Sequence, residues 1–451
     1  MFKPIKNAGA GIYACGPTVY NFAHIGNLRT YIFEDLLKRM FIYNKYKVKH
    51  VMNITDVGHL TSDGDDGEDK MLLGAKREGK SVWDIARFYE KAFFEDTGKL
   101  NILNPDIKCR ATEHIQDMIN LIKRIEENGF TYVSGGNLYF NIEKFKDYGK
   151  LSGLSLSDLK AGARIEVDEN KKNPHDFVLW FTKSKHGNQD MQWESPWGRG
   201  FPGWHIECSA MSVKYLGECI DIHCGGIDHI NVHHTNEIAQ SEAATGKKWV
   251  NFWLHGEFLI MDKGKMSKSA GEFITLKTLT DKGFEPLDFR YLCLGAHYRT
   301  QLAFSYEALE GARNGLKNLR RKIIELDNLP AHISCNKKKE DYRKKFNLLI
   351  NDDLNIPQAL AFLWDLIRDE TISPEDRLKL VYEFDEVLGL GIRDNFAKRT
   401  KVPEDVHLLL DKRMKARADK NWKEADRLRE EVFKKGFKVE DTPGGQKIFE
   451  L

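Results

Sequence analysis

The alternation of apolar runs with polar turns predicts an α/β fold over the first two-thirds of the chain. A short apolar run at 11–16 closes with Gly16-Pro17, as is typical of a buried parallel strand. Between residues 25 and 40, apolar side chains recur every three or four positions, which predicts a helix, and residues 49–55 return to a strand pattern. A strand–helix–strand unit favours a mostly parallel sheet, whose ligands bind at the carboxyl ends of the strands.

Changes in this pattern divide the rest of the chain. Residues 129–200 carry short strand-like pieces and turn-rich runs, the pattern of an insertion between two halves of the first domain. Alternation of strands and helices then returns, and from residue 305 the pattern is almost wholly helical until Pro403 opens a last small unit. We therefore predict five segments, at 1–128, 129–200, 201–304, 305–400 and 401–451.

Composition narrows the class of protein. The chain has 451 residues, of which 41% are hydrophobic and 30% charged, so it is long enough for about three ordinary globular domains. Its apolar runs are too short to span a membrane, and residues 1–7 lack the apolar core of a signal peptide, so we expect no membrane association. Seven cysteines, few and odd in number, argue against a disulfide framework and predict a reducing, cytoplasmic location.

Charge is nearly balanced overall but unevenly distributed. The formal net charge is +2, so the total identifies no partner. Residues 313–345, however, hold eleven basic and four acidic side chains, and residues 412–438 hold eleven and five. Two basic stretches in the C-terminal third fit a polyanionic partner. Solvated, lysine-rich helix faces explain them equally well on charge alone.

The first candidate for chemistry is His24-Ile25-Gly26-Asn27, where the first strand gives way to the first helix. A helix N-terminus presents free N–H groups and a positive dipole end to phosphates. The side chains of His24 and Asn27 add hydrogen-bond donors, and Gly26 lets a flat base approach the backbone. Alone, such a tetrapeptide is more often an ordinary turn.

The second candidate is Lys265-Met266-Ser267-Lys268-Ser269, which follows an apolar strand predicted at 252–261. Lys265 and Lys268 can neutralise charge on a departing pyrophosphate, which is electrostatic stabilisation of a transition state. A loop rich in lysine and serine is usually plain surface. The two motifs together, in this order on a strand–helix–strand frame, are a strong signal.

The pair is the hallmark of class I aminoacyl-tRNA synthetases, and the chain resembles the cysteinyl-tRNA synthetases over nearly its full length. Four further motifs carry that resemblance: Gly16-Pro17-Thr18-Val19-Tyr20, Asn53-Ile54-Thr55-Asp56, Gly203-Trp204-His205-Ile206-Glu207-Cys208 and His233-His234-x-Asn236-Glu237. The resemblance implies a Rossmann-type catalytic domain with an inserted connective subdomain. A tRNA-binding helical bundle and a small α+β anticodon-binding domain then follow.

The activity that the resemblance implies is cysteine–tRNA ligation by a monomeric enzyme. L-cysteine attacks the α-phosphate of ATP, held with Mg²⁺, and the resulting cysteinyl-adenylate passes its acyl group to the terminal adenosine of cysteine tRNA. The resemblance assigns catalysis to His24, Asn27, Lys265 and Lys268, ATP binding to Gly26, Gly225, Gly226, Asp228 and again Lys268, and cysteine binding to Thr55 and Trp204.

The resemblance also implies one Zn²⁺ per chain, with Cys15, Cys208, His233 and Glu237 as ligands. Spacing alone does not select these four, because other cysteines and histidines lie close to them in the sequence. Zinc holds a substrate thiol as a thiolate, whereas a serine hydroxyl is a poorer ligand, so the ion can select cysteine. Four protein ligands describe a closed site, so a purely structural zinc remains an alternative.

Near the C-terminus, the resemblance assigns Arg417, Trp422 and Asp426 to the tRNA anticodon. An indole can stack on an unpaired base, while a guanidinium and a carboxylate can read donor and acceptor edges. Without the resemblance, a half-buried tryptophan among surface charges is the simpler interpretation.

Two other functions remain open at this point. A related ligase joins cysteine to an aminosugar in mycothiol synthesis and shares both the ATP motifs and the zinc site. It lacks a C-terminus that reads tRNA, so residues 305–451 count against it. The second is a non-catalytic RNA-binding paralogue, which the intact His24, Asn27, Lys265 and Lys268 disfavour.

Overall fold

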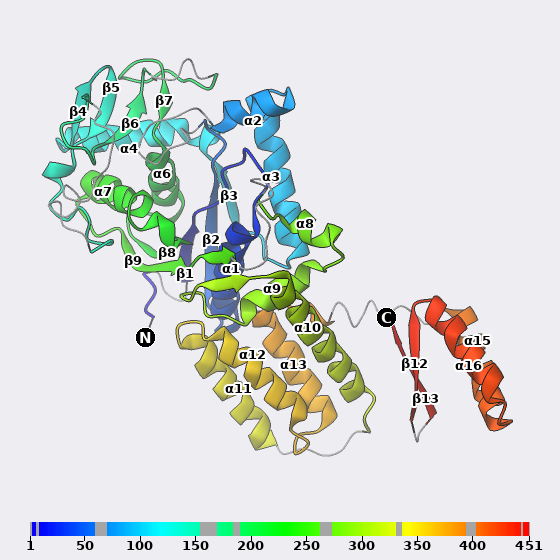
Figure 1. The fold of residues 1–451 in the computed structure, drawn as a ribbon. Coiled ribbons are helices and arrows are strands. Elements are labelled where there is room, and N and C mark those ends of the chain that lie inside the picture. Colours follow the sequence, from blue (N-terminus) through cyan, green and yellow to red (C-terminus); the bar gives the residue numbers. More distant parts are fainter. Residues whose placement is uncertain are drawn as a thin grey trace. The chain divides into compact units, whose positions relative to one another are not determined.

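The computed structural model describes residues 2–5, 9–58, 70–153, 169–183, 190–261, 273–330, 336–393, 403–442 and 445–450. The chain forms two compact units, Met1–Leu390 and Gly391–Leu451 (Figure 1). Among these residues, no helix combines the length and the apolarity needed to cross a bilayer. The six cysteines described are all free thiols.

The first unit is built on a five-stranded sheet in which every neighbouring pair is parallel. Its strand order is β3-β2-β1-β8-β9. The strands are β1 (Gly9–Ala14), β2 (Lys47–Ile54), β3 (Ile107–Arg110), β8 (Ile220–Gly226) and β9 (Val250–Gly256). The predicted parallel α/β fold is confirmed. The order reverses between β1 and β8, and ligands of such sheets bind in the crevice that this reversal opens.

Helices that connect these strands bring polar groups to that crevice. Helix α1 (Ile25–Tyr43) follows β1, and helices α2 (Lys70–Glu78) and α3 (Val82–Lys99) lie between β2 and β3. Helices α6 (Trp204–Leu216) and α7 (His233–Thr245) flank β8 in the sequence. Most of α1 is buried, charged residues included, because it packs against both the sheet and the helices of the bundle.

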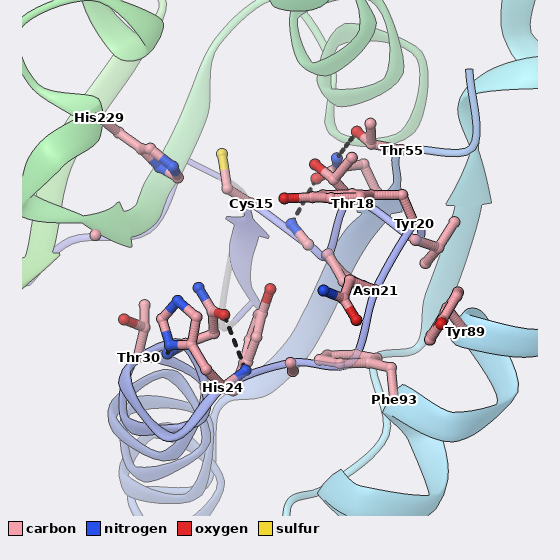
Figure 2. A pocket seen from close by; sticks show the side chains of 18 of the residues that line it. Cys15, Thr18, Tyr20, Asn21, His24, Thr30, Thr55, Tyr89, Phe93 and His229 are labelled. Atoms are coloured by element: carbon pink, nitrogen blue, oxygen red, sulfur yellow. Dashed lines mark hydrogen bonds between the residues drawn. The ribbon is translucent and has the colours of Figure 1, made fainter. Parts of the chain in front are cut away.

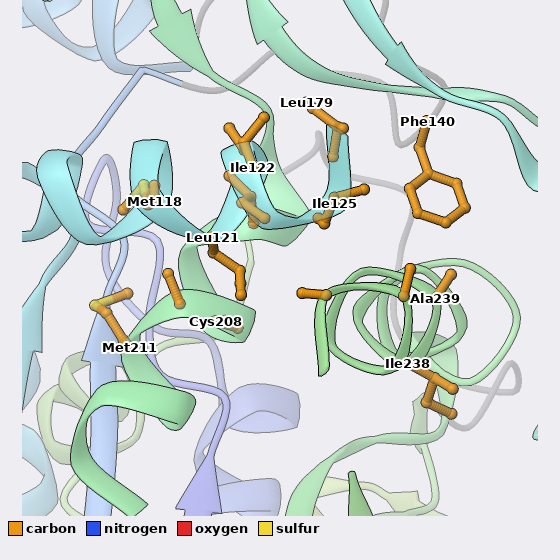
Figure 3. Close-up of a cluster of buried hydrophobic side chains, with 14 of the residues drawn as sticks. Met118, Leu121, Ile122, Ile125, Phe140, Leu179, Cys208, Met211, Ile238 and Ala239 are labelled. Atoms are coloured by element: carbon orange, nitrogen blue, oxygen red, sulfur yellow. The ribbon is translucent and has the colours of Figure 1, made fainter. Parts of the chain in front are cut away.

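A separate antiparallel sheet of order β4-β5-β6-β7 has its first three strands within the segment predicted as an insertion, and β7 lies directly after that segment. Its strands are β4 (Thr131–Ser134), β5 (Asn137–Phe140), β6 (Phe177–Phe181) and β7 (Phe201–Pro202). Figure 3 shows α4 (Ile115–Glu127) between this sheet and helices α6 and α7. Apolar side chains from all three layers form one core, and Cys208 belongs to it. The core therefore fixes the helices that carry the site.

One predicted strand was wrong in length. The apolar run at 252–261 is two strands, because β9 ends at Gly256 and the chain then turns into a second, two-stranded parallel sheet. The buried guanidinium of Arg29 donates hydrogen bonds to the carbonyls of Glu257 and Phe258, at 2.8 and 2.6 Å. The carbonyl of Phe258 also accepts the N–H of Leu302, at 3.1 Å, where the second sheet begins. The second sheet contains β10 (Leu259–Met261) and β11 (Leu302–Phe304).

The helical part of the first unit packs on α1 through a buried charge network. Asp35 of α1 accepts hydrogen bonds from Arg39 at 2.7 Å and Arg290 at 2.6 Å, and Arg290 also donates to the carbonyl of Leu388. Such pairs fix geometry well, because removing one partner leaves a buried charge uncompensated. The helices are α8 (Leu276–Asp281), α9 (Pro286–Leu294), α10 (Tyr306–Asp327), α11 (Asn336–Asn351), α12 (Ile356–Arg368) and α13 (Pro374–Leu388).

The second unit packs two helices on a β-hairpin. These elements are α15 (Glu404–Ala418), α16 (Trp422–Lys434), β12 (Phe437–Thr442) and β13 (Gly445–Glu450). Arg413 is only 1% exposed and donates to both carboxylate oxygens of Asp441 at 2.8 Å. That bidentate pair ties α15 to the hairpin.

Candidate active site

A pocket of about 350 Å³ opens at the carboxyl ends of β1 and β8, where the strand order reverses. Its lining includes the first predicted motif and most of the predicted amino-acid and metal residues. Figure 2 shows Cys15, His24, Thr55 and His229 around this cavity, on the strand ends and loops that enclose it. The position agrees with the rule for open parallel sheets.

The first motif forms the N-terminus of α1. His24 is the N-cap residue: its Nδ1 accepts the N–H of Asn27, and Oδ1 of Asn27 accepts the N–H of His24, both at 3.2 Å. Because Nδ1 accepts, a neutral His24 ring carries its proton on Nε2. Burial lowers the pKa of His24, which favours the neutral ring. The motif thus offers one fixed imidazole donor and a helix N-terminus to an anion.

Lys265 and Lys268 of the second motif lie outside the described residues, and so their roles stay predictions. The segment that follows them returns to the first motif. The ring of Phe273 stacks on His24 with centroids 5.2 Å apart, and Ile25 donates its N–H to the carbonyl of Ile274 at 2.8 Å. Residues 273 and 274 therefore contact the N-terminus of α1 directly.

The four predicted metal ligands come together at one end of the pocket. Cys15 follows β1, Cys208 lies on α6, and His233 and Glu237 occupy successive turns of α7. One ligand atom from each residue lies within 4.8 Å of the others, and all four side chains are buried. Two sulfurs, an imidazole nitrogen and a carboxylate oxygen are ordinary donors for zinc.

Strong ion pairing holds the carboxylate of this cluster. Oε1 of Glu237 lies 2.6 Å from Nε2 of His233, and its Oε2 lies 2.6 Å from Nε2 of His223. Burial alone raises the pKa of Glu237, but the two imidazoles hold it well below its usual range. Burial lowers the pKa of His233, yet the charge of Glu237 outweighs this and brings it to about 10.

The two thiols differ from each other. Burial, a hydrogen bond with Cys208 and nearby acids raise the pKa of Cys15 well above its usual value. Burial also acts to raise the pKa of Cys208, but hydrogen bonds from Cys15 and His233 outweigh it, so that this pKa is lowered. A metal ion binds the thiolate and the neutral imidazole, so binding at this pair would release any proton that the two groups hold.

A second group of metal-compatible residues, which the sequence did not reveal, shares part of this cluster. It consists of Cys15, His223, His234 and Glu237, all buried. His234 lies between Sγ of Cys15, at 3.3 Å from its Nε2, and Nε2 of His255, at 2.8 Å from its Nδ1. The outer imidazoles therefore form a hydrogen-bonded layer behind the predicted ligands, an arrangement that usually orients metal ligands. No spacing in the sequence indicates it.

The residues predicted to bind the amino acid lie beside the cluster. Thr55, 1% exposed, donates from Oγ1 to Oε2 of Glu207 at 3.0 Å and accepts from Asn53 at 3.1 Å. The indole of Trp204 packs on the ring of His233, with centroids 4.4 Å apart. Both Thr55 and Trp204 line the pocket, together with Cys15, Cys208 and His233 of the predicted metal ligands.

The predicted ATP-binding glycines lie in two places: Gly225 and Gly226 at the end of β8, and Gly26 at the start of α1. Gly226 and the exposed Asp228 line the pocket after β8, and a Cβ on Gly226 would lie 2.3 Å from Oδ1 of Asp228. A Cβ on Gly26 would lie 2.9 Å from the His24 ring, so glycine leaves the backbone open to a ligand at this position. A Cβ on Gly225 would lie 2.6 Å from Nδ1 of His229.

His229 is a pocket residue that the sequence did not assign. It lines the cavity, and its buried Nδ1 has no hydrogen-bond partner among the described residues. Burial and the charge of His233 lower the pKa of His229 to about 4, so the ring is neutral.

In the second unit, the predicted anticodon residues form an exposed patch. The guanidinium of Arg417 lies 5.5 Å from the centroid of the Trp422 ring and donates to Oδ2 of Asp441 at 2.8 Å. Asp426 lies one turn beyond Trp422 on α16 and pairs with Arg429 at 3.0 Å. The structure thus brings Arg417 and Trp422 together, while the contact described for Asp426 is with a different residue.

Comparison with known proteins covers both units. Residues 1–314 match the family described as tRNA synthetases class I (C) catalytic domain, and residues 399–448 match the one described as Cysteinyl-tRNA ligase anticodon binding domain. A Cysteine--tRNA ligase of Treponema denticola is 54% identical, with 98% of this chain and 96% of the relative aligned. Cysteine--tRNA ligase 1 of Burkholderia lata is 50% identical, over 99% of this chain and 94% of its own.

A solved structure supports the fold independently. Methionyl-tRNA synthetase of Mycobacterium tuberculosis, in complex with methionyl-adenylate, superposes with a TM-score of 0.57 over 85% of this chain and 90% of that one. At 17% sequence identity, this likeness concerns the fold alone. It agrees with the Rossmann-type arrangement of the parallel sheet.

Proposed function

The chain belongs to the cysteinyl-tRNA synthetase family, and from this premise we propose that its pocket activates L-cysteine with ATP and Mg²⁺ for transfer to cysteine tRNA. The activity is that of a cysteine–tRNA ligase, which is the name of relatives aligned with nearly the whole chain. The match over residues 399–448 to an anticodon-binding family argues against the cysteine:aminosugar ligase, which lacks such a unit. We propose a monomer that acts in the cytoplasm, where its tRNA substrate is found.

The observation that carries this proposal is the buried Cys15, Cys208, His233 and Glu237 cluster at the end of the pocket. Its donor set fits zinc, since two soft sulfurs accompany a nitrogen and an oxygen. Zinc bound there would hold the substrate thiol as a thiolate and so favour cysteine over serine. The layer of His223 and His234 holds Glu237 and Cys15 in place for that ion.

Thr55 and Trp204 then orient the amino acid beside the cluster, with its carboxylate toward the N-terminus of α1. That carboxylate attacks the α-phosphate, and the bond from this phosphorus to the bridging oxygen of pyrophosphate breaks. Negative charge moves onto the leaving pyrophosphate, where the Nε2–H of His24, the amide of Asn27, Lys265 and Lys268 stabilise it. Positioning and charge stabilisation dominate such displacements.

The remaining predicted residues bind the nucleoside and the tRNA. Backbone at Gly26, Gly225 and Gly226 admits the adenosine, and Asp228 accepts hydrogen bonds from the ribose. In the second unit, Trp422 stacks on an unpaired anticodon base, while Arg417 and Asp426 read base edges. The basic stretch at 313–345 is the part of the chain that we expect to contact the tRNA backbone.

The test is cysteine-dependent exchange of pyrophosphate into ATP, followed by a choice of acceptor. The purified chain should exchange with cysteine and not with serine, and it should then charge cysteine tRNA. If the chain couples cysteine to an aminosugar and charges no tRNA, it is the cysteine:aminosugar ligase instead. Binding of tRNA without any exchange would identify a non-catalytic paralogue.

A further inference from the structure

Three aromatic side chains meet at the rim of the pocket, on the side formed by α3. Phe22 precedes the first motif, and Phe88 and Tyr89 are neighbours on α3. Their ring centroids lie 5.0 Å apart for Phe22 and Tyr89, 5.0 Å for Phe88 and Tyr89, and 6.0 Å for Phe22 and Phe88, all edge to face. We call these three residues the aromatic wall.

The aromatic wall begins inside the pocket and continues out of it. Phe22 and Tyr89 belong to the pocket lining, and Figure 2 shows Tyr89 on α3 at its edge. Phe88 extends the same surface outward from them. Phe22 is 42% exposed and Phe88 44%, while Tyr89 between them is only 4% exposed. The chain therefore presents two ring surfaces to solvent beside the cavity in which the adenylate forms.

The central ring of the wall is fixed by hydrogen bonds at the hydroxyl of Tyr89, and Phe22 and Phe88 both pack on that ring. That hydroxyl donates to Glu78 of α2 and accepts from Arg77 at 2.9 Å. A rigid exposed aromatic surface loses little conformational entropy when a flat ligand stacks on it. Bases of single-stranded nucleic acid are such ligands, since each has a π-face.

Cations stand next to the rings. Nζ of Lys80 lies 4.6 Å from the centroid of Phe88, and the guanidinium of Arg77 lies 6.0 Å from that of Tyr89. Lys80 also pairs with Glu78 at 3.3 Å, and its side chain is 44% exposed. Exposed pairs of this kind contribute little, so a phosphate can take the place of that carboxylate. Aromatic rings combined with exposed cations are the usual platform for an unpaired strand.

We propose that the aromatic wall, with Lys80, is the docking surface for the unpaired 3′ end of the tRNA. The proposal rests on the proposed function. The terminal adenosine has to reach the acyl group inside the pocket, so the nucleotides before it cross the rim. There, Phe22 and Phe88 supply stacking surfaces, and Lys80 supplies a charge for the backbone phosphate.

The test separates activation from transfer by means of Phe88→Ala. Phe88 is not among the residues that line the pocket, so cysteine-dependent pyrophosphate exchange should equal that of the parent. Transfer of cysteine from preformed adenylate to subsaturating tRNA should slow by at least about fivefold, the lower end of the effect of losing one base-stacking ring. Phe88→Tyr should restore the parental rate, because it keeps the ring.

Trp83→Ala is the matched control, since Trp83 is 42% exposed and lies on the same helix. It should leave both exchange and transfer unchanged. A second readout is competition by tRNA trimmed of its unpaired 3′ nucleotides. The parent should bind intact tRNA more tightly than trimmed tRNA, and Phe88→Ala should shrink this difference without weakening binding of the trimmed form.

Results that contradict the docking proposal can be told apart from failure of the proposed ligase function. If the parent charges tRNA and Phe88→Ala transfers cysteine equally fast, the aromatic wall does not hold the 3′ end, although the ligase function stands. Equal weakening of intact and trimmed tRNA also overturns the proposal, because the lost contact is then elsewhere on the tRNA. Dissociation of a dimer by Phe88→Ala, with transfer unchanged, identifies the wall as an interface between copies.

Discussion

The cluster of predicted metal ligands and the patch of predicted anticodon residues are both built from a few polar side chains, but the chain assembles them in opposite ways. The cluster draws Cys15, Cys208, His233 and Glu237 from distant segments and buries all of them. The patch takes residues 417–426 from two successive helices and leaves Trp422 56% exposed. The first site is therefore a product of the whole fold, and the second is largely a product of local helix geometry.

The two regions also differ in how much free energy their ion pairs contribute. Glu237 and His233 form a pair at 2.6 Å with both side chains buried. Asp426 and Arg429 pair at 3.0 Å with more than half of each side chain exposed. Removing one member of a buried pair typically costs about 3–5 kcal/mol, whereas an exposed pair contributes about 0–1 kcal/mol. Substitutions in the cluster should thus disable the site, and those in the patch should only weaken it.

The largest expected effect is loss of the metal. Cys208→Ser and His233→Ala should reduce bound zinc from one per chain to almost none, and exchange should fall by more than about 100-fold, the upper range for loss of a partner that merely orients a ligand. Cys219→Ser is the control, because Cys219 is only half-buried and its thiol donates to the carbonyl of Lys248. Elemental analysis of all three variants decides the matter, and full zinc retention in the first two contradicts the ligand assignment.

The next effect concerns the step at which pyrophosphate leaves. Lys268→Ala should slow formation of the adenylate by about 3–4 kcal/mol in barrier height, because its charge is needed chiefly as pyrophosphate leaves. Binding of cysteine should change little. Lys277→Ala is the control, since Lys277 is exposed and pairs with Asp281 at 2.7 Å. An unchanged rate together with weakened binding of cysteine would give Lys268 a different role.

The contrast between local patterns and contacts of distant segments also decides which features could be predicted from the sequence. The parallel sheet could be predicted, because its strands and helices have local apolar periodicities. The division of 252–261 into two strands could not, since it depends on Arg29, more than 200 residues away in the sequence. The four ligands came from resemblance to a family, and spacing alone did not distinguish them from His223 and His234. Folding places those two imidazoles behind the ligands, which no local pattern encodes.

A third effect concerns the pH dependence of stability, which the buried region should dominate. Burial raises the pKa of Asp56 from 3.8 to about 6, although Thr112 donates two hydrogen bonds to it. As pH rises, Asp56 ionises in the unfolded chain before it does so in the folded one. The free energy of unfolding therefore falls between about pH 4 and 6, by up to roughly 3 kcal/mol.

Asp56→Asn should remove that fall, because an amide can keep both contacts with Thr112 without becoming charged. Denaturant unfolding of the parent and this variant at pH 4, 5, 6 and 7 measures it. The exposed Asp426→Asn is the control and should reproduce the parental pH profile. A parallel decline in the parent and Asp56→Asn would assign the pH dependence to other groups.

The smallest expected effect belongs to the exposed patch, and it falls on a different step. Trp422→Ala should leave cysteine-dependent pyrophosphate exchange intact, because Trp422 belongs to the second compact unit, whereas the pocket is built from the first. Charging of cysteine tRNA should weaken by about 1–3 kcal/mol, the usual cost of removing an aromatic ring that stacks on a base. Phe433→Ala is the matched control, since Phe433 is 57% exposed on the same helix. Arg417→Ala should act in the same direction, because it removes an edge-reading donor and also the cation that lies 5.5 Å from the indole centroid and helps to fix the ring. Charging at parental efficiency by both Trp422→Ala and Arg417→Ala would mean that the second unit reads the tRNA elsewhere on its surface.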